Sequence, residues 1–123
     1  MSATIVPRPF KERYTFQERS AESRKILDKF PGRVPIIVER ALKDNITPLI
    51  DKNKFLCPGD LTVGQFLFII RNRIRLPSEK ALFVFINDSL PPTNTLIKQV
   101  YQQFRQDDGF VYMAYCGENV FGE

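Results

Sequence analysis

The chain has 123 residues, of which 43% are hydrophobic and 26% are charged, a balance typical of one globular domain with a single core. No apolar run approaches the roughly 20 residues of a membrane helix and no secretory segment opens the chain, so we expect a soluble, intracellular protein. The formal net charge of +4 favours anionic partners: acidic peptides, phospholipid headgroups or nucleic acid.

The first thirty residues are expected to form helices. Pro7 and Pro9 suit a helix start or an extended lead-in, but not a helix interior. Thr15 and Glu18 have the spacing of a capping box, and the helix that they begin should end at the Pro-Gly pair at 31–32. Its apolar face is narrow, so we expect few anchors to hold it on the domain surface. The residues of that face are Phe16, Ser20, Ser23, Ile26, Leu27 and Phe30.

Two strands are predicted next. Arg33–Arg40 is apolar on both faces, which is typical of a strand near the centre of a sheet. Its Pro35 lacks a backbone donor, so we expect irregular structure on one side of that residue. After a polar stretch, Lys54–Pro58 is short, lysine-flanked and closed by a proline. These features predict an edge strand, antiparallel to the strand before it.

The third predicted helix begins at a second capping box, formed by Thr62 and Gln65, and runs to about Arg75. Its apolar set is wider than one stripe and leaves Phe68 and Ile69 at the sides. The helix is therefore either covered on two sides or lines a groove.

The remaining elements are a strand over 81–86, a short helix over 95–104 and a last strand over 108–116. An Asp-Gly turn opens the last strand, which is apolar on both faces. We therefore expect it to lie near the middle of the sheet, with the tail beyond it projecting from the core.

Residues that could carry catalysis are scarce. The chain has no histidine and no glycine-rich phosphate loop, and neither Cys57 nor Cys116 has a metal-ligand setting. Both cysteines are expected to be buried structural thiols. We expect no enzyme activity, no cofactor and no metal site. Because the aromatic residues fall at core positions, no nucleic-acid partner is expected either.

Several long segments carry a resemblance: Phe10–Arg13, Phe30–Glu39, Lys54–Pro58, Leu61–Phe66, Asp108–Tyr112 and the Phe-Gly pair at 121–122. Together they resemble the autophagy ubiquitin-like modifiers, the family of microtubule-associated protein light chain three and the GABA-receptor-associated protein. The resemblance implies an α+β fold, a ubiquitin-like β-grasp whose four-stranded mixed sheet is preceded by two additional N-terminal helices. Its expected parts are a helical extension (1–30), the β-grasp core (31–116) and a C-terminal tail (117–123).

The resemblance implies conjugation to a lipid. In that family an activating enzyme adenylates a terminal glycine, which passes through cysteine thioesters on conjugating enzymes to the amino group of phosphatidylethanolamine. Gly122 is the matching residue, because a residue without Cβ can thread a narrow enzyme slot. Phe121 just before it offers an anchor. Glu123 departs from the working form, so the family's processing cysteine protease would first remove it. The sheet residues that match the protease platform are Phe83 and Phe85, for which plain core packing is the alternative. For the tail, a frayed terminus is the alternative.

Peptide binding is the second implied activity. An edge strand can accept an extended ligand strand, with alternate ligand side chains entering pockets. The implied ligands are aromatic-x-x-aliphatic motifs of cargo receptors, with acidic residues upstream. By resemblance, the aromatic pocket consists of Glu22, Ile26, Pro35, Ile37, Lys54, Leu56 and Phe110. The aliphatic pocket consists of Phe55, Cys57, Pro58, Leu61, Phe66, Ile69 and Ile70. The contacts to acidic residues are Arg13, Lys52, Lys54 and Arg73.

Two positions depart from the family pattern. Tyr14 stands where a second basic residue is frequent, and Asn72 interrupts a basic run, so we expect an altered preference among acidic motifs.

The expected function is that of an autophagy modifier in the cytoplasm and on the autophagosome membrane. The resemblance adds the vacuole or lysosome and the cytoskeleton as further locations and tubulin as a further partner. The alternative is an unconjugated ubiquitin-like scaffold that binds peptides or tubulin. The two differ in whether Gly122 becomes a reactive terminus.

Overall fold

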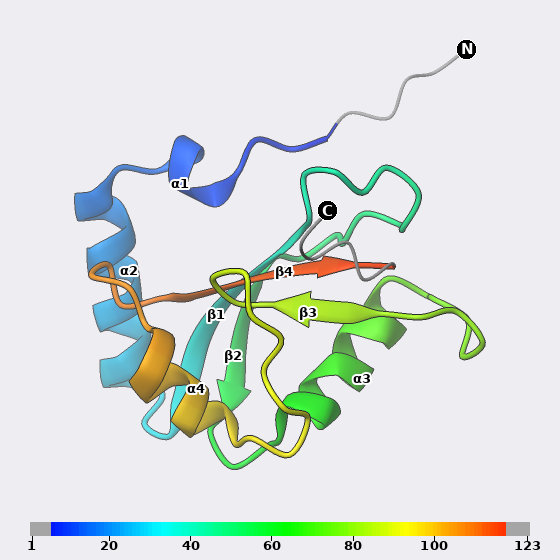
Figure 1. Cartoon of the computed structure of the whole chain (residues 1–123). Helices are drawn as coiled ribbons and strands as arrows, with labels where there is room; N and C mark the ends of the chain where they lie inside the picture. The colour runs from blue at the N-terminus through cyan, green and yellow to red at the C-terminus, as the bar shows by residue number, and fades with distance from the viewer. Residues whose placement is uncertain (1–5, 118–123) are drawn as a thin grey trace.

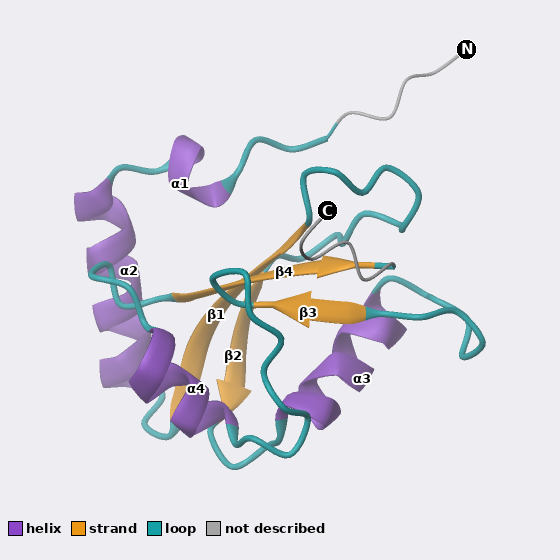
Figure 2. Cartoon of the chain, viewed as in Figure 1, coloured by secondary structure: helices purple, strands orange, loops and turns teal. Residues whose placement is uncertain are grey.

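A computed structural model describes residues 6–117, and residues 1–5 and 118–123 lie outside the described part. The eight elements occur in the predicted order (Figures 1 and 2). They are α1 (Phe10–Arg13), α2 (Phe16–Lys29), β1 (Arg33–Arg40), β2 (Lys54–Pro58), α3 (Val63–Arg73), β3 (Phe83–Phe85), α4 (Ile97–Phe104) and β4 (Val111–Cys116). Within the described part, no helix is long and apolar enough to cross a membrane.

The four strands form one mixed sheet in the order β2-β1-β4-β3. The central strands β1 and β4 are parallel, whereas β2 and β3 each run antiparallel to their neighbour. The central position of the last strand and the edge position of Lys54–Pro58 are therefore confirmed. The ladder between β1 and β4 begins at Ile36, one residue beyond Pro35. Pro35 thus lies outside that ladder, as its missing donor predicts.

The sheet separates a large core from a small one. Ile36 and Val38 lie in the large core, where they pack with apolar residues of α3 and α4. Between them in sequence, Ile37 faces the opposite side and packs with Phe10 of α1 and Ile26 of α2. Figure 2 shows β1 and β2 passing between α2 on one side and α3 on the other. Alternation along β1 thus explains why this strand is apolar on both faces.

Three elements are shorter than predicted. The third strand covers only 83–85, because it pairs with β4 alone and the chain turns through positive φ at Asn87 and Asp88. The last strand begins at 111, after a turn at Gly109. Gly109 has a φ of +89°, and a Cβ there would lie 2.3 Å from the hydroxyl oxygen of Ser23. The fourth helix begins at 97 rather than 95.

Both predicted capping boxes are present, at Thr15 with Glu18 and at Thr62 with Gln65. The expectation of few anchors on α2 is confirmed, because only Ser23 and Ile26 of this helix are buried. Even this narrow face is only partly covered. Its Phe16, Leu27 and Phe30 are exposed, since α2 contacts the sheet mainly through the small core.

A buried carboxylate fastens α2 to the turn before β4. Asp108 is 3% exposed and accepts hydrogen bonds from the Arg19 Nε (2.9 Å), the Tyr112 hydroxyl (2.5 Å) and the Phe110 amide (3.0 Å). The Ser23 hydroxyl donates to the Asp108 carbonyl at 2.5 Å. Helix α2 is therefore joined to the rest of the fold by hydrogen bonds as well as by apolar contacts.

This network predicts a specific acid sensitivity. Burial by itself raises the pKa of Asp108, but the bonds from Tyr112, Phe110 and Arg19 outweigh it and hold the pKa below its ordinary value of 3.8. A lowered folded-state pKa gives stability that is present above about pH 4 and is lost as the pH falls through the folded-state value. Asp108→Asn should lower the free energy of unfolding at pH 7 by about 2 kcal/mol. It should also flatten the dependence of stability on pH below 4, measured by urea denaturation. An acid profile as steep as that of the unchanged chain would contradict this role.

Candidate functional site

The edge strand β2 is the centre of the candidate site. It pairs with β1 on one side, and no strand of the described residues pairs with its other side. Burial alternates along it, so that Phe55 and Cys57 face the large core while Lys54, Leu56 and Pro58 are half-buried. An unpaired edge with alternating side chains has the geometry that accepts an added strand.

The predicted aromatic-pocket residues come together at one corner of the sheet. Ile26, Ile37 and Phe110 share the small core, and Leu56 packs against it from β2. In the β1–β2 register, Pro35 lies opposite Leu56 and Ile37 opposite Lys54. Glu22 completes the set, because its carboxylate accepts a hydrogen bond from the Lys54 ammonium at 2.7 Å. The structure thus gathers side chains that are as far apart in sequence as 22 and 110.

Phe10 is a member of this corner that the sequence analysis did not assign. Its ring is 7% exposed and meets the Phe110 ring edge-on, with 5.4 Å between centroids. Its backbone amide donates to the Glu39 carboxylate at 2.7 Å. The sequence contains one signal for this role: Phe10 is a single large apolar residue followed directly by the charged residues 11–13. Phe10 completes the small core, so α1 packs against the corner through this residue.

The predicted contacts for acidic ligand residues are partly occupied within the chain. Lys54 is paired with Glu22, and Arg73 is paired with Asp51 through its Nε at 2.8 Å. Lys52 is exposed, and its ammonium lies 5.5 Å from the centre of the Phe55 ring. A ligand carboxylate would therefore meet Lys52 directly but would compete with Glu22 for Lys54 and with Asp51 for Arg73. This competition has no signal in the sequence, because the paired residues are 32 and 22 positions apart.

The predicted aliphatic-pocket residues divide into a floor and a rim. Phe55, Cys57, Phe66 and Ile70 are buried in the large core, and the rings of Phe55 and Phe66 meet edge-on at 5.5 Å. Leu61 and Pro58 are half-buried, and Ile69 is 38% exposed. Burial raises the pKa of the Cys57 thiol to about 11, which makes it a packing group. Only the rim could contact a ligand without rearrangement of the core.

The predicted tail residues Phe121 and Gly122 lie outside the described residues. The tail's base is described at Gly117, whose amide donates to the Asp44 carboxylate at 3.0 Å. Of the predicted protease platform, Phe83 is half-buried and Phe85 is 9% exposed. Both side chains lie on the same face of β3, with Phe83 the more accessible.

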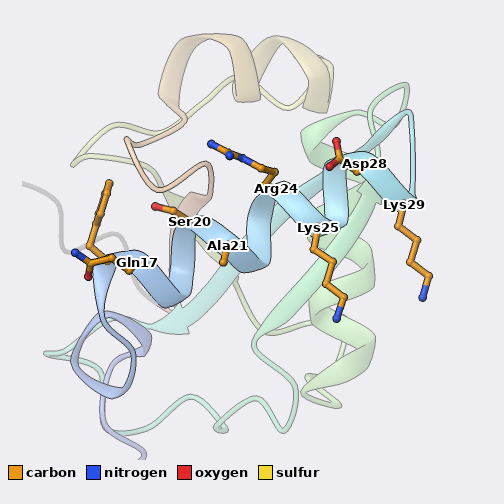
Figure 3. Close-up of a pocket in the computed structure, with 8 residues that line it drawn as sticks. Gln17, Ser20, Ala21, Arg24, Lys25, Asp28 and Lys29 are labelled. Carbon is orange, nitrogen blue, oxygen red and sulfur yellow. The ribbon is translucent and has the colours of Figure 1, made fainter.

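A separate shallow hollow follows the outer surface of α2 (Figure 3). Lys25 and Lys29 project on one side of the helix and Arg24 on the other, and half of the residues that line the hollow are charged. None of the predicted site residues lines this hollow. It is an exposed helix face, separate from the candidate site along β2.

Comparison with known proteins gives one consistent result. A family model described as "Autophagy protein Atg8 ubiquitin like" matches residues 18–122. Autophagy-related protein 8 of Candida glabrata is 56% identical over 113 residues, covering 92% of this chain and 95% of that one. The protein of the same name from Saccharomyces cerevisiae is 55% identical over 113 residues, covering 92% and 96%. The crystal structure of Trypanosoma brucei ATG8 has a TM-score of 0.86 and 40% identity, covering 94% of this chain and 99% of that one.

Proposed function

This chain belongs to the Atg8 family of ubiquitin-like autophagy proteins, and we propose that it is joined through Gly122 to phosphatidylethanolamine and that its β2 edge binds peptide motifs. The fold is the ubiquitin-like β-grasp of that family. The chain is therefore an autophagy ubiquitin-like modifier, and its processing, attachment and ligands are the proposed part.

One observation carries the peptide-binding half of the proposal. The free edge of β2 lies between a corner built with α2 and a rim built with α3, so an added strand would place alternate side chains at both. Burying an aromatic side chain of about 150 to 250 Å² at about 25 cal/mol per Å² gives roughly 4 to 6 kcal/mol before ordering costs. A few main-chain hydrogen bonds at about 1 kcal/mol each support a net of about 8 kcal/mol, which is micromolar affinity.

The proposal assigns roles to three parts of the chain. Residues 1–30 form a helical extension that supports the aromatic corner, residues 31–116 form the β-grasp core, and residues 117–123 form the conjugated tail. A processing cysteine protease exposes Gly122, activating and conjugating enzymes transfer it, and cargo receptors bind the groove. The proposed location is the cytoplasm and the autophagosome membrane.

The test of conjugation is the intact mass of the protein recovered from membrane and soluble fractions of cells that express it. A membrane form that ends at Gly122 and is heavier by one phosphatidylethanolamine is the expected result. If all of the protein stays soluble at its unprocessed mass, even under starvation, the unconjugated scaffold that binds peptides or tubulin becomes the better proposal.

The Glu22–Lys54 pair gives a prediction in the direction of tighter binding. The Lys54 hydrogen bond lowers the pKa of Glu22, so this carboxylate is ionised at neutral pH and competes with a ligand's acidic residue. Glu22→Gln should free Lys54 and tighten binding of an acidic-flanked peptide by about two- to fivefold, as expected for a half-exposed ion pair.

Titration calorimetry at low and high salt measures this effect, and added salt should reduce it. Asp28→Asn is the matched control, because it removes the same charge from α2 without touching Lys54. Equal affinities for the two variants would show that Glu22 does not compete.

A further inference from the structure

Two aliphatic side chains stand out on the loop that joins β1 to β2. Leu42 is 93% exposed and Ile46 is 85% exposed, the highest values among the large apolar residues of the described part. Lys43 lies between them in sequence and is also exposed. The peptide groove does not use these residues, since it lies along β2 between α2 and α3. Figure 1 shows this loop at the end of the sheet where β4 finishes.

The loop is fastened to the base of the tail by Asp44. This carboxylate accepts hydrogen bonds from the amides of Ile46 and Thr47, each at 2.9 Å, and from the Thr47 hydroxyl. The same carboxylate accepts from the Gly117 amide at 3.0 Å. One side chain therefore shapes the loop that carries Ile46 and holds the residue at which the tail leaves the sheet.

Contacts from β4 reinforce this attachment. The Ala41 amide donates to the Tyr115 carbonyl at 2.8 Å, and the buried Tyr115 hydroxyl donates to the Pro48 carbonyl at 2.7 Å. The loop is thus hydrogen-bonded to the end of β4 and the base of the tail at three of its residues, Ala41, Asp44 and Pro48.

Burial by itself raises the pKa of Asp44, but its hydrogen bonds from Thr47, Ile46 and Gly117 lower the pKa to about 2. The attachment therefore persists at every physiological pH.

Chain length limits how far this loop can be from a tethered lipid. Gly122 follows Gly117 by five residues, which span at most about 18 Å when fully extended. A lipid joined to Gly122 would therefore keep Gly117, and the loop bonded to it, within that length of the bilayer surface. Apolar side chains exposed at that distance meet the headgroup region, where Lys43 can meet lipid phosphates.

We propose that Leu42 and Ile46 insert into the bilayer to which the tail is tethered, with Asp44 as the positioning residue that keeps loop and tail base together. This inference rests on the proposed attachment at Gly122. It assigns to the loop the task of fixing the orientation of the domain on the membrane, with the β2 edge left open to ligands.

The experiment couples the protein to lipid without enzymes. Gly122→Cys is reacted with phosphatidylethanolamine bearing a maleimide headgroup, in phosphatidylcholine vesicles with brominated acyl chains, and mass spectrometry confirms the coupled thiol. Cys57 and Cys116 are buried and compete little for the reagent. The chain has no tryptophan, so Ile46→Trp supplies a single reporter at an exposed position.

Bromine should quench this tryptophan at least twofold more strongly on coupled vesicles than for uncoupled protein. The control is Leu90→Trp, which follows β3 at the opposite end of the sheet and should stay unquenched. A tryptophan at 46 that is no more quenched than the one at 90, and is fully open to aqueous iodide, would overturn the proposal.

The role of Asp44 has its own comparison. In the Ile46→Trp chain, Asp44→Asn leaves one acceptor oxygen in place of two, so the Ile46 and Thr47 amides and the Gly117 amide can no longer all be bonded as they are to the carboxylate. Quenching should therefore fall by about half. Asp51→Asn removes the same charge from the same loop without contacting Gly117 and should leave quenching unchanged. Equal quenching in both variants would overturn the role of Asp44. A loop that inserts after chemical coupling, in a protein never lipidated in cells, would uphold this inference and refute the proposed conjugation.

Discussion

Replacing Gly122 by alanine is expected to abolish the phosphatidylethanolamine-linked form while leaving peptide binding intact. In the proposed conjugation, the carboxyl group of residue 122 passes in extended form through the narrow sites of the protease and of the transferring enzymes. A Cβ at that residue obstructs the approach, which glycine alone permits. The expected loss is at least 100-fold in the lipidated fraction, measured by intact mass of the membrane-bound protein.

A matched control in the same tail distinguishes an effect specific to residue 122 from a general effect of substitution in the tail. Asn119→Ala also places an alanine in the tail, but at a residue that already has a Cβ, and it should leave lipidation within about twofold. The peptide affinity of both variants should equal that of the unchanged chain, because β1 separates the β2 edge from β4, the strand that precedes the tail. Recovery of a lipidated alanine variant would refute the assignment of Gly122.

Replacing Lys52 and Leu56 together by alanine should abolish micromolar binding of an acidic-flanked Trp-x-x-Leu peptide. Leu56 packs against the small core at the aromatic corner. Lys52, like Arg13, is an exposed cation of the predicted set that has no ion-pair partner among the described residues. Loss of the apolar wall and of the charge should weaken binding at least 100-fold, about 2.7 kcal/mol, as measured by titration calorimetry.

The control for this pair has the same composition at the other edge of the sheet. Lys80 and Leu90 flank β3, and both are exposed. Their double alanine variant should bind the peptide as the unchanged chain does. The single variants separate the contributions of the two residues to peptide affinity, because added salt should diminish the contribution of Lys52 but not that of Leu56. If Lys52→Ala, Leu56→Ala and the double variant all bind normally, the ligand site lies elsewhere on the molecule.

The sequence predicted the order and type of the elements because local signals were strong. The capping boxes at Thr15 and Thr62 placed two helix starts, and the β-branched run after Arg33 indicated a strand buried on both faces. The proline-ended, lysine-flanked β2 predicted an edge. These signals act over a few residues, so they can be read without knowledge of the neighbours in space.

The competition for the predicted basic residues could not be predicted in the same way. Lys54 with Glu22 and Arg73 with Asp51 are pairs between elements distant in sequence, and their partners are set by how α2 and α3 pack beside β2. Likewise, Phe16 and Phe30 belong to an apolar face by spacing, yet they are exposed because α2 touches the sheet at only a few positions. Periodicity identifies a face, but only packing decides how much of it is covered.

By itself, the sequence determined the β-grasp order, the central and edge strands and the family resemblance, and it predicted the glycine of the tail as the conjugated residue. Only the tertiary structure showed that Phe10 closes the small core, that Asp108 fastens α2 to the turn before β4, and that Asp44 holds the exposed loop to Gly117. The physical reason is common to all three. Each is a contact between groups at least 70 residues apart, whose formation depends on the assembled sheet and not on any local pattern.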